Sequence, residues 1–168
     1  MIIVKNEEEL AKMRASAELA ARVRDAVAEK TCPGITTLEL SKFAGKMIRD
    51  LGGASAFLGY RGYPGEICIS INESVVHGIP DGRRIAVGDI VGIDVGVNYE
   101  GFVGDTATTV MVGVTDPEVI KLVRTTEKAL AGAIKSARAG ARLSDVSHTI
   151  EKTARESGFS VVRDFVGH

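Results

Sequence analysis

Residues 89–112 read DIVGIDVGVNYEGFVGDTATTVMV, and this stretch decides the fold. In its first half an apolar set, Val91, Ile93, Val95 and Val97, alternates with Ile90, Gly92, Asp94 and Gly96. A period of two residues is typical of a strand that buries one face. Residues 98–101 have the composition of a turn, and Phe102 begins a return strand. The stretch therefore predicts a β-hairpin.

The hairpin carries two aspartates. We expect Val97 to pair with Phe102, which places Asp94 directly opposite Asp105. Directly opposed residues on antiparallel strands have Cβ atoms roughly 4.5–5.5 Å apart. Two carboxylates at that distance repel each other unless a proton or a cation lies between them. The hairpin therefore predicts a metal site.

The neighbours of the aspartates support this interpretation. Gly92 and Gly96 flank Asp94 on its own face, and glycine in a strand often marks the close approach of a ligand or another backbone. Thr106 follows Asp105 and offers a hydroxyl that could orient a carboxylate. Two carboxylates without a cysteine cluster suit Mn, Fe, Co or Zn. Bridging aspartates suggest two metal ions roughly 3.5–4 Å apart, the spacing of hydrolytic dinuclear centres.

Three histidines could complete such a site. His77 follows an apolar run, where a catalytic histidine and a hydrogen-bonded structural one fit the spacing equally well. His148 is expected on the solvated side of a helix. His168 follows Gly167, which would let its imidazole come close to a metal.

Composition limits the class of protein. The chain has 168 residues, 45% of them hydrophobic, which predicts one domain with a sizeable core. Its net charge of −1 gives no reason to expect nucleic-acid specificity or an anionic membrane as partner. The first residues lack the apolar run of a signal peptide, and no stretch approaches 18 apolar residues. Two cysteines suit a reducing compartment, so we expect the cytoplasm.

The other elements follow from caps and turns. Helices are expected from Asn6, from Thr36 or Thr37, from Asp116-Pro117 and over 144–157. Strands are expected at 54–58, 66–71 and 74–77, and a last one at 159–165. Strands grouped with helices to one side predict an α+β domain. Because the chain stops on Gly-His directly after a strand, we expect that it is truncated.

Three blocks of sequence resemble a type I methionine aminopeptidase. They are GYRGYPGEICISINESVVHGIP (59–80), GDIVGIDVGVNYEGFVGDTA (88–107) and FVGH (165–168), and they occur in the family's order. The resemblance implies the N-terminal portion of a pita-bread fold, a curved antiparallel sheet with helices on its outer face. It also implies that Asp94, Asp105 and His168 are ligands of two divalent metal ions (Co, Mn, Fe or Zn), with Asp105 bridging.

The resemblance gives further residues a role. His77 would be the catalytic histidine that contacts the scissile amide. Tyr60, Tyr63 and Cys68 match residues around the pocket for the methionine side chain, and Phe57 stands where some relatives have a small cysteine. The implied activity removes the N-terminal methionine from nascent polypeptides. The implied partners are those polypeptides and, transiently, the ribosome, with a monomer as the full-length form.

The resemblance also shows what the 168 residues lack. Members of the family continue into a second half that supplies two glutamate ligands and a second histidine. Residues 1–168 would therefore be a single but incomplete metallopeptidase domain, and we expect it to be inactive or weakly active alone. Two alternatives stay open: a non-catalytic binding module that keeps the fold, and a proline-specific aminopeptidase relative.

Overall fold

The computed structural model of the chain describes residues 3–164, which divide into two compact units with a boundary after Val114. The first unit contains two helices and a sheet, and the second contains two helices. Among the described residues, no helix combines the length and apolar character that a membrane crossing requires.

The two helices of the first unit begin where their caps predict. Helix α1 (Glu7–Lys30) starts after Asn6, whose side chain accepts from the backbone N of Glu9, while the Glu9 carboxylate accepts from the backbone N of Asn6. Helix α2 (Thr37–Asp50) has the same capping box, built from Thr36 and Glu39. Each box satisfies two backbone N–H groups that a helix start leaves without partners.

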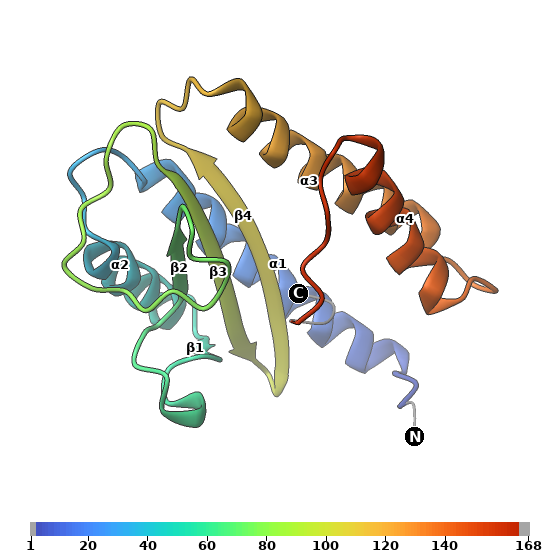
Figure 1. Ribbon diagram of the computed structural model, residues 1–168. Helices are drawn as coiled ribbons and strands as arrows, with labels where there is room; N and C mark the ends of the chain where they lie inside the picture. The colour runs from blue at the N-terminus through green and yellow to red at the C-terminus, as the bar shows by residue number, and fades with distance from the viewer. Residues whose placement is uncertain (1–2, 165–168) are drawn as a thin grey trace. The chain divides into compact units, whose positions relative to one another are not determined.

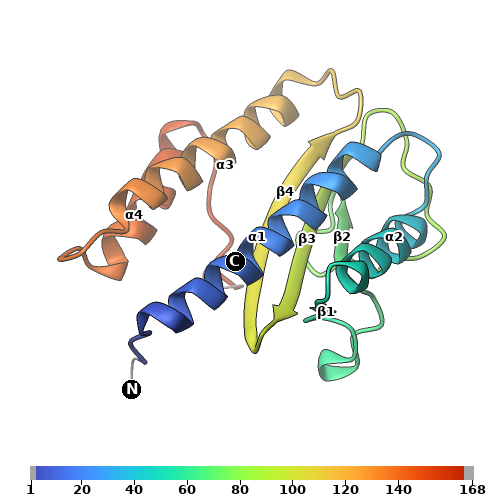
Figure 2. The same cartoon turned by 180° about the vertical axis from the view of Figure 1, so that it is seen from behind.

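The sheet is antiparallel throughout, and its centre is strand β3 (Ile90–Tyr99). Strand β4 (Phe102–Met111) pairs with β3 along its whole length. Strand β2 (Cys68–Ile71) pairs with the other edge of β3, and strand β1 (Ala54–Ser55) pairs directly with the same edge further along β3. Figures 1 and 2 show α1 and α2 on one face of this sheet. The predicted α+β class is confirmed.

The core lies between the helices and the apolar face of β3. Val91, Ile93, Val95 and Val97 are fully buried, as are Val23 and Val27 of α1 and Leu40 and Ile48 of α2. Helix α1 comes so close to β4 that a Cβ at Gly104 would overlap the backbone of Ser16. The Ser16 hydroxyl points at the carbonyl oxygens of Val97 and Phe102, 3.0 and 2.9 Å away. The helices therefore cover the face opposite the aspartates.

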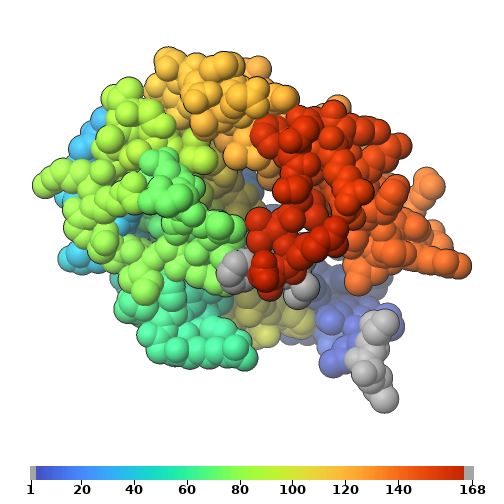
Figure 3. All heavy atoms as spheres, viewed as in Figure 1, coloured from blue at the N-terminus to red at the C-terminus, as the bar shows by residue number. Residues whose placement is uncertain are grey.

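A long irregular segment, residues 72–89, joins β2 to β3 and is visible in yellow-green in Figure 3. The strand predicted at 74–77 is wrong, because these residues have no ladder partner and His77 has a φ of +57°. The segment is held at its ends by the Asn72 side chain, which donates to Asp89 (2.8 Å). In its middle, the Thr37 hydroxyl accepts from the backbone N of Asp81 (2.8 Å).

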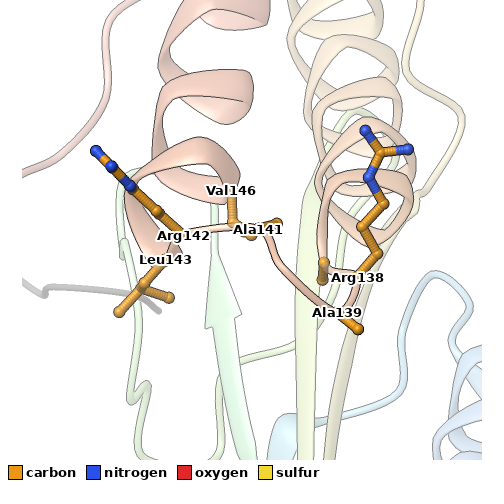
Figure 4. Close-up of a pocket in the computed structure, with 7 residues that line it drawn as sticks. Arg138, Ala139, Ala141, Arg142, Leu143 and Val146 are labelled. Carbon is orange, nitrogen blue, oxygen red and sulfur yellow. The ribbon is translucent and has the colours of Figure 1, made fainter.

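The second unit is a helical hairpin. Helix α3 (Pro117–Ser136) begins with the predicted cap, since Asp116 accepts from the backbone N of Glu118 and Pro117 is the first residue. Helix α4 (Leu143–Glu156) packs against it, and the hydroxyls of Ser136 and Thr149 lie 3.0 Å apart. A shallow depression lies at the connection (Figure 4), where Arg138 and Arg142 point apart.

The strand predicted at 159–165 is wrong for its described part. Residues 159–164 have no strand structure, and the backbone N of Phe159 donates to the carbonyl of Ala154 (2.9 Å), a bond that closes the end of α4. The Phe159 ring lies against the Lys121 side chain, with the ammonium 5.3 Å from the ring centroid. Phe159 is therefore bound to the helical hairpin.

Candidate metal centre

The two aspartates are diagonal neighbours. Asp94 lies opposite Ala107, and Asp105 lies opposite Gly96, so the predicted direct pairing is wrong. The connection between the strands is only Glu100–Gly101, and both residues have positive φ, the signature of a tight two-residue hairpin turn. Strand β3 therefore continues to Tyr99, and the register shifts by two residues from the predicted one.

A shift of two residues keeps both aspartates on the same face of the sheet. Diagonal neighbours are roughly 7–8 Å apart at Cα, with somewhat less between the Cβ atoms. The two carboxylates are therefore not forced into contact, and their repulsion alone does not require a cation between them. One oxygen of Asp94, Oδ1, is completely buried, whereas Asp105 is exposed.

The Phe57 ring lies on this face. A Cβ at Gly96 would overlap the ring, so the glycine opposite Asp105 accommodates an aromatic side chain. The sequence interpretation expected a ligand or a backbone there. The role expected for Thr106 is also wrong. Its side chain faces α1, where its hydroxyl accepts from Arg24 (2.7 Å). It cannot orient Asp105.

Cys68 joins the aspartates from the other edge of β3. It is buried and lies directly opposite Asp94 in the β2–β3 pairing. Burial, together with the negative charges of Asp94 and Asp105, raises the pKa of its thiol to about 11. Both carboxylates are therefore close enough to act on a single thiol, which places all three side chains around one region.

The two tyrosines differ in their surroundings. Tyr63 is half-buried, and its hydroxyl donates to the carbonyl of Gly78 (2.8 Å), with that of Ile67 at 3.3 Å. Burial raises its pKa, and Cys68 and Asp94 raise it further. Tyr60 lies in the 3₁₀ turn η1 (Tyr60–Gly62), where it is 63% exposed and stacks on the Arg61 guanidinium. The role of Tyr60 in a pocket stays a prediction.

His77 is followed by Gly78, whose backbone contacts the aspartate face, the face of the sheet that carries Asp94 and Asp105. The backbone N of Gly78 donates to the Ser70 hydroxyl (3.0 Å), and Ser70 shares a face of β2 with Cys68. The His77 side chain is exposed. The structure thus gathers Asp94, Asp105, Cys68, Phe57 and Tyr63 in one region and brings the backbone at His77 to its edge.

The sequence pattern shared by metallopeptidase family M24 matches residues 11–168 of the chain. The chain belongs to metallopeptidase family M24. It is 43% identical over 168 residues to the methionine aminopeptidase of Clostridium perfringens, covering 100% of this chain and 68% of that protein. It is 44% identical to methionine aminopeptidase A of Synechocystis, covering 99% and 66%. This M24 chain therefore spans about two thirds of the length of these relatives.

Solved M24 structures agree with the fold. The methionine aminopeptidase of Thermotoga maritima matches with a TM-score of 0.97 and 41% identity, over 100% of this chain and 68% of that one. The prolidase of Pyrococcus furiosus matches with a TM-score of 0.80 at 20% identity, over 93% and 45%, which shows the fold alone. The predicted pita-bread fold and the resemblance to the methionine aminopeptidases are confirmed.

Membership of a metallopeptidase family implies dependence on a divalent metal ion. Two carboxylates on one face are oxygen donors that suit such an ion, so the donor chemistry fits. Within residues 3–164, however, no group of three or more His, Cys, Asp or Glu side chains is placed to hold a metal. His168 lies outside the described residues, and His148 is exposed on α4 as expected. The described residues thus provide two carboxylate side chains as candidate metal ligands.

The sequence analysis did not predict that Ser70 and Gly78 lie at the aspartate face. A signal for Ser70 was present, because Cys68 and Ser70 alternate with the core residues Ile69 and Ile71 and must share the aspartate face. Nothing in the sequence indicated the contact of Gly78 with β2, since it joins a strand to an irregular segment.

Proposed function

We propose that this M24 chain carries part of the catalytic site of an enzyme that removes the N-terminal methionine from polypeptides. The observation that supports this most is the gathering of Asp94, Asp105 and Cys68 on one face of the β2–β3–β4 sheet. Relatives with 37–44% identity are methionine aminopeptidases, whereas the similar prolidases share about 20% of residues and support the fold only.

Each residue of the site has a role that its surroundings support. Asp94 and Asp105 would hold two divalent cations, with His168 as a further ligand. Such cations polarise a scissile carbonyl and activate water at neutral pH. Cys68 stays a neutral thiol because of its raised pKa, and with Phe57 and Tyr63 it would form an apolar wall for a thioether side chain.

The remaining roles complete the proposal. His77 would donate a hydrogen bond to the substrate amide, and Tyr60 would close the pocket from its exposed turn. The two compact units would belong to one catalytic domain, which the family match over 11–168 supports. We place the enzyme in the cytoplasm as a monomer that meets nascent chains near the ribosome.

Metal binding by the chain tests the proposal directly. Titration of the 168-residue chain with Mn²⁺, followed by electron paramagnetic resonance of the free ion, should show binding. Replacing either aspartate, Asp94→Ala or Asp105→Ala, should weaken it by at least about tenfold, because each removes a carboxylate donor. Hydrolysis of Met-Ala-Ser with and without metal gives the activity of the same samples.

A matched control is Asp50→Ala, which removes an exposed carboxylate that is paired with Lys46 at the end of α2. This variant should bind Mn²⁺ like the wild type. Unchanged binding by both aspartate variants of the hairpin would overturn the metal site. Release of an N-terminal residue other than methionine at a higher rate would overturn the proposed substrate.

A further inference from the structure

The residue after His77 is held against the aspartate face by three hydrogen bonds. The backbone N of Gly78 donates to the Ser70 hydroxyl at 3.0 Å. The carbonyl of Gly78 accepts from the backbone N of Ile69 at 3.0 Å and from the Tyr63 hydroxyl at 2.8 Å. Both polar groups of a single backbone position are therefore bound to residues on or beside β2.

Ser70 is well placed for this contact. It is only 9% exposed and pairs with Gly92 of β3, on the same face of the sheet as Cys68 and Asp94. A Cβ at Gly92 would meet Ser70 only at ordinary van der Waals distances, so the opposite strand does not crowd the Ser70 side chain. A buried hydroxyl needs a partner, and here the partner is the N–H that follows His77.

The local backbone explains why such anchoring is needed. His77 has a φ of +57°, a left-handed conformation that is unfavourable for a residue other than glycine. Gly78 runs so close to β2 that a Cβ there would overlap the carbonyl of Ile69. The conformation at His77 persists because the bonds to Gly78 fix the next peptide group.

The Tyr63 hydroxyl is a constant donor. A phenol has an ordinary pKa of about 10 and therefore keeps its proton near neutral pH, and burial raises the pKa of Tyr63 further. The bond to the Gly78 carbonyl at 2.8 Å is shorter than the 3.3 Å to Ile67, so Gly78 is its better acceptor.

We propose that Ser70 and Tyr63 are positioning residues, whose hydroxyls clamp the Gly78 peptide and thereby hold the His77 imidazole at the edge of the aspartate face. The Ser70 role is new to the site, and Tyr63 gains a role beyond that of a pocket wall. The consequence for the reaction rests on the proposed function, because it assumes that His77 contacts the substrate.

The clamp can be tested on the 168-residue chain without any reaction. Ser70→Ala should speed amide exchange at Gly78 about three- to tenfold, the effect of losing one hydrogen bond of ordinary strength. It should also shift the imidazole NMR signals of His77 and leave those of His148 unchanged. Ser70→Thr keeps a hydroxyl and should restore both readouts, while Tyr63→Phe removes only the second anchor and should give a partial effect.

The control is Ser160→Ala, an exposed serine outside the helices and strands. It should change neither readout. If Ser70→Ala and Tyr63→Phe fold like the wild type, and the Gly78 exchange rate and His77 signals do not move, the clamp is overturned. If Ser70→Thr behaves like Ser70→Ala, a hydroxyl at this position is not what holds the turn.

A second arm separates the clamp from the proposed function. Addition of L-methioninamide with Zn²⁺ should shift the His77 imidazole signals of the wild type, and this shift should fall by at least half in Ser70→Ala. Absence of any shift in the wild type would count against the proposed function while leaving the ligand-free results on the clamp intact. An equal shift in wild type and Ser70→Ala would show that the clamp does not serve substrate binding.

Discussion

At the scale of single residues, Cys68 reports on the electrostatics of the candidate site. Its pKa is raised to about 11 by burial and by the two aspartates, so about one thiol in a thousand is the reactive thiolate at pH 8. Cys32 is exposed. We expect iodoacetamide to modify Cys32 at least about 100-fold faster than Cys68. Mass spectrometry of peptides after timed labelling measures both rates.

The chain unfolded in urea provides the reference for this labelling, because there the two thiols lose their different surroundings and should react at similar rates. Equal rates in the folded chain would mean that Cys68 is not buried beside the aspartates. Labelling of Cys68 should rise as the pH approaches 11, since deprotonation and not access alone limits its reaction.

The shared face of Asp94 and Asp105 was predictable, whereas their pairing was not. Alternation along a strand fixes the face of each residue from sequence alone. The register depends on which residues form the turn, and composition allowed a longer turn than the observed Glu100–Gly101. The contact of Tyr63 with Gly78 was beyond prediction, because it depends on the path of an irregular segment.

At the scale of elements, the packing of α1 on β4 depends on one missing side chain. In Gly104→Ala the added Cβ would overlap the backbone of Ser16 and Ala17, which cannot rotate away. Helix α1 must then move off the sheet, and we expect a loss of about 1–3 kcal/mol or more in unfolding free energy. Urea unfolding followed by far-ultraviolet circular dichroism measures it.

Gly82→Ala is the matched control, because a Cβ there meets no atom within 4 Å and φ is not positive. It should leave the urea midpoint unchanged or raise it slightly, since alanine restricts the unfolded chain. A Gly104→Ala midpoint equal to that of Gly82→Ala would contradict the close packing of α1 on β4.

Helix starts were more predictable than strands. The side chains of Asn6, Thr36 and Asp116 form their caps with residues two or three positions away, so the signal is local. A strand needs a partner that the local sequence does not contain. Residues 74–77 have a strand-like composition, but Val75 is 62% exposed, and the backbone N of Ile69 in β2 donates to the carbonyl of Gly78, which lies outside the predicted strand.

At the scale of the whole molecule, the two compact units differ in how much they bury. Helix α1 buries five residues and β3 has four fully buried valine or isoleucine residues, whereas no residue of α4, all of which is described, is buried. Helix α3 buries four residues, but its Leu130 and Ile134 are 57% and 65% exposed. The apolar residues of the second unit therefore contribute less to folding than those of the first.

This difference predicts unequal protection of the backbone. Segments with few buried apolar contacts open at a lower free-energy cost than the core, so amides of α4 should exchange at least about tenfold faster than those of β3. Hydrogen–deuterium exchange with mass spectrometry, corrected for the intrinsic rate of each peptide, measures both in one sample. Asp116→Ala removes the cap of α3 and should speed exchange at the start of α3 without changing β3. Equal protection of α4 and β3 would instead mean that the two units open only together.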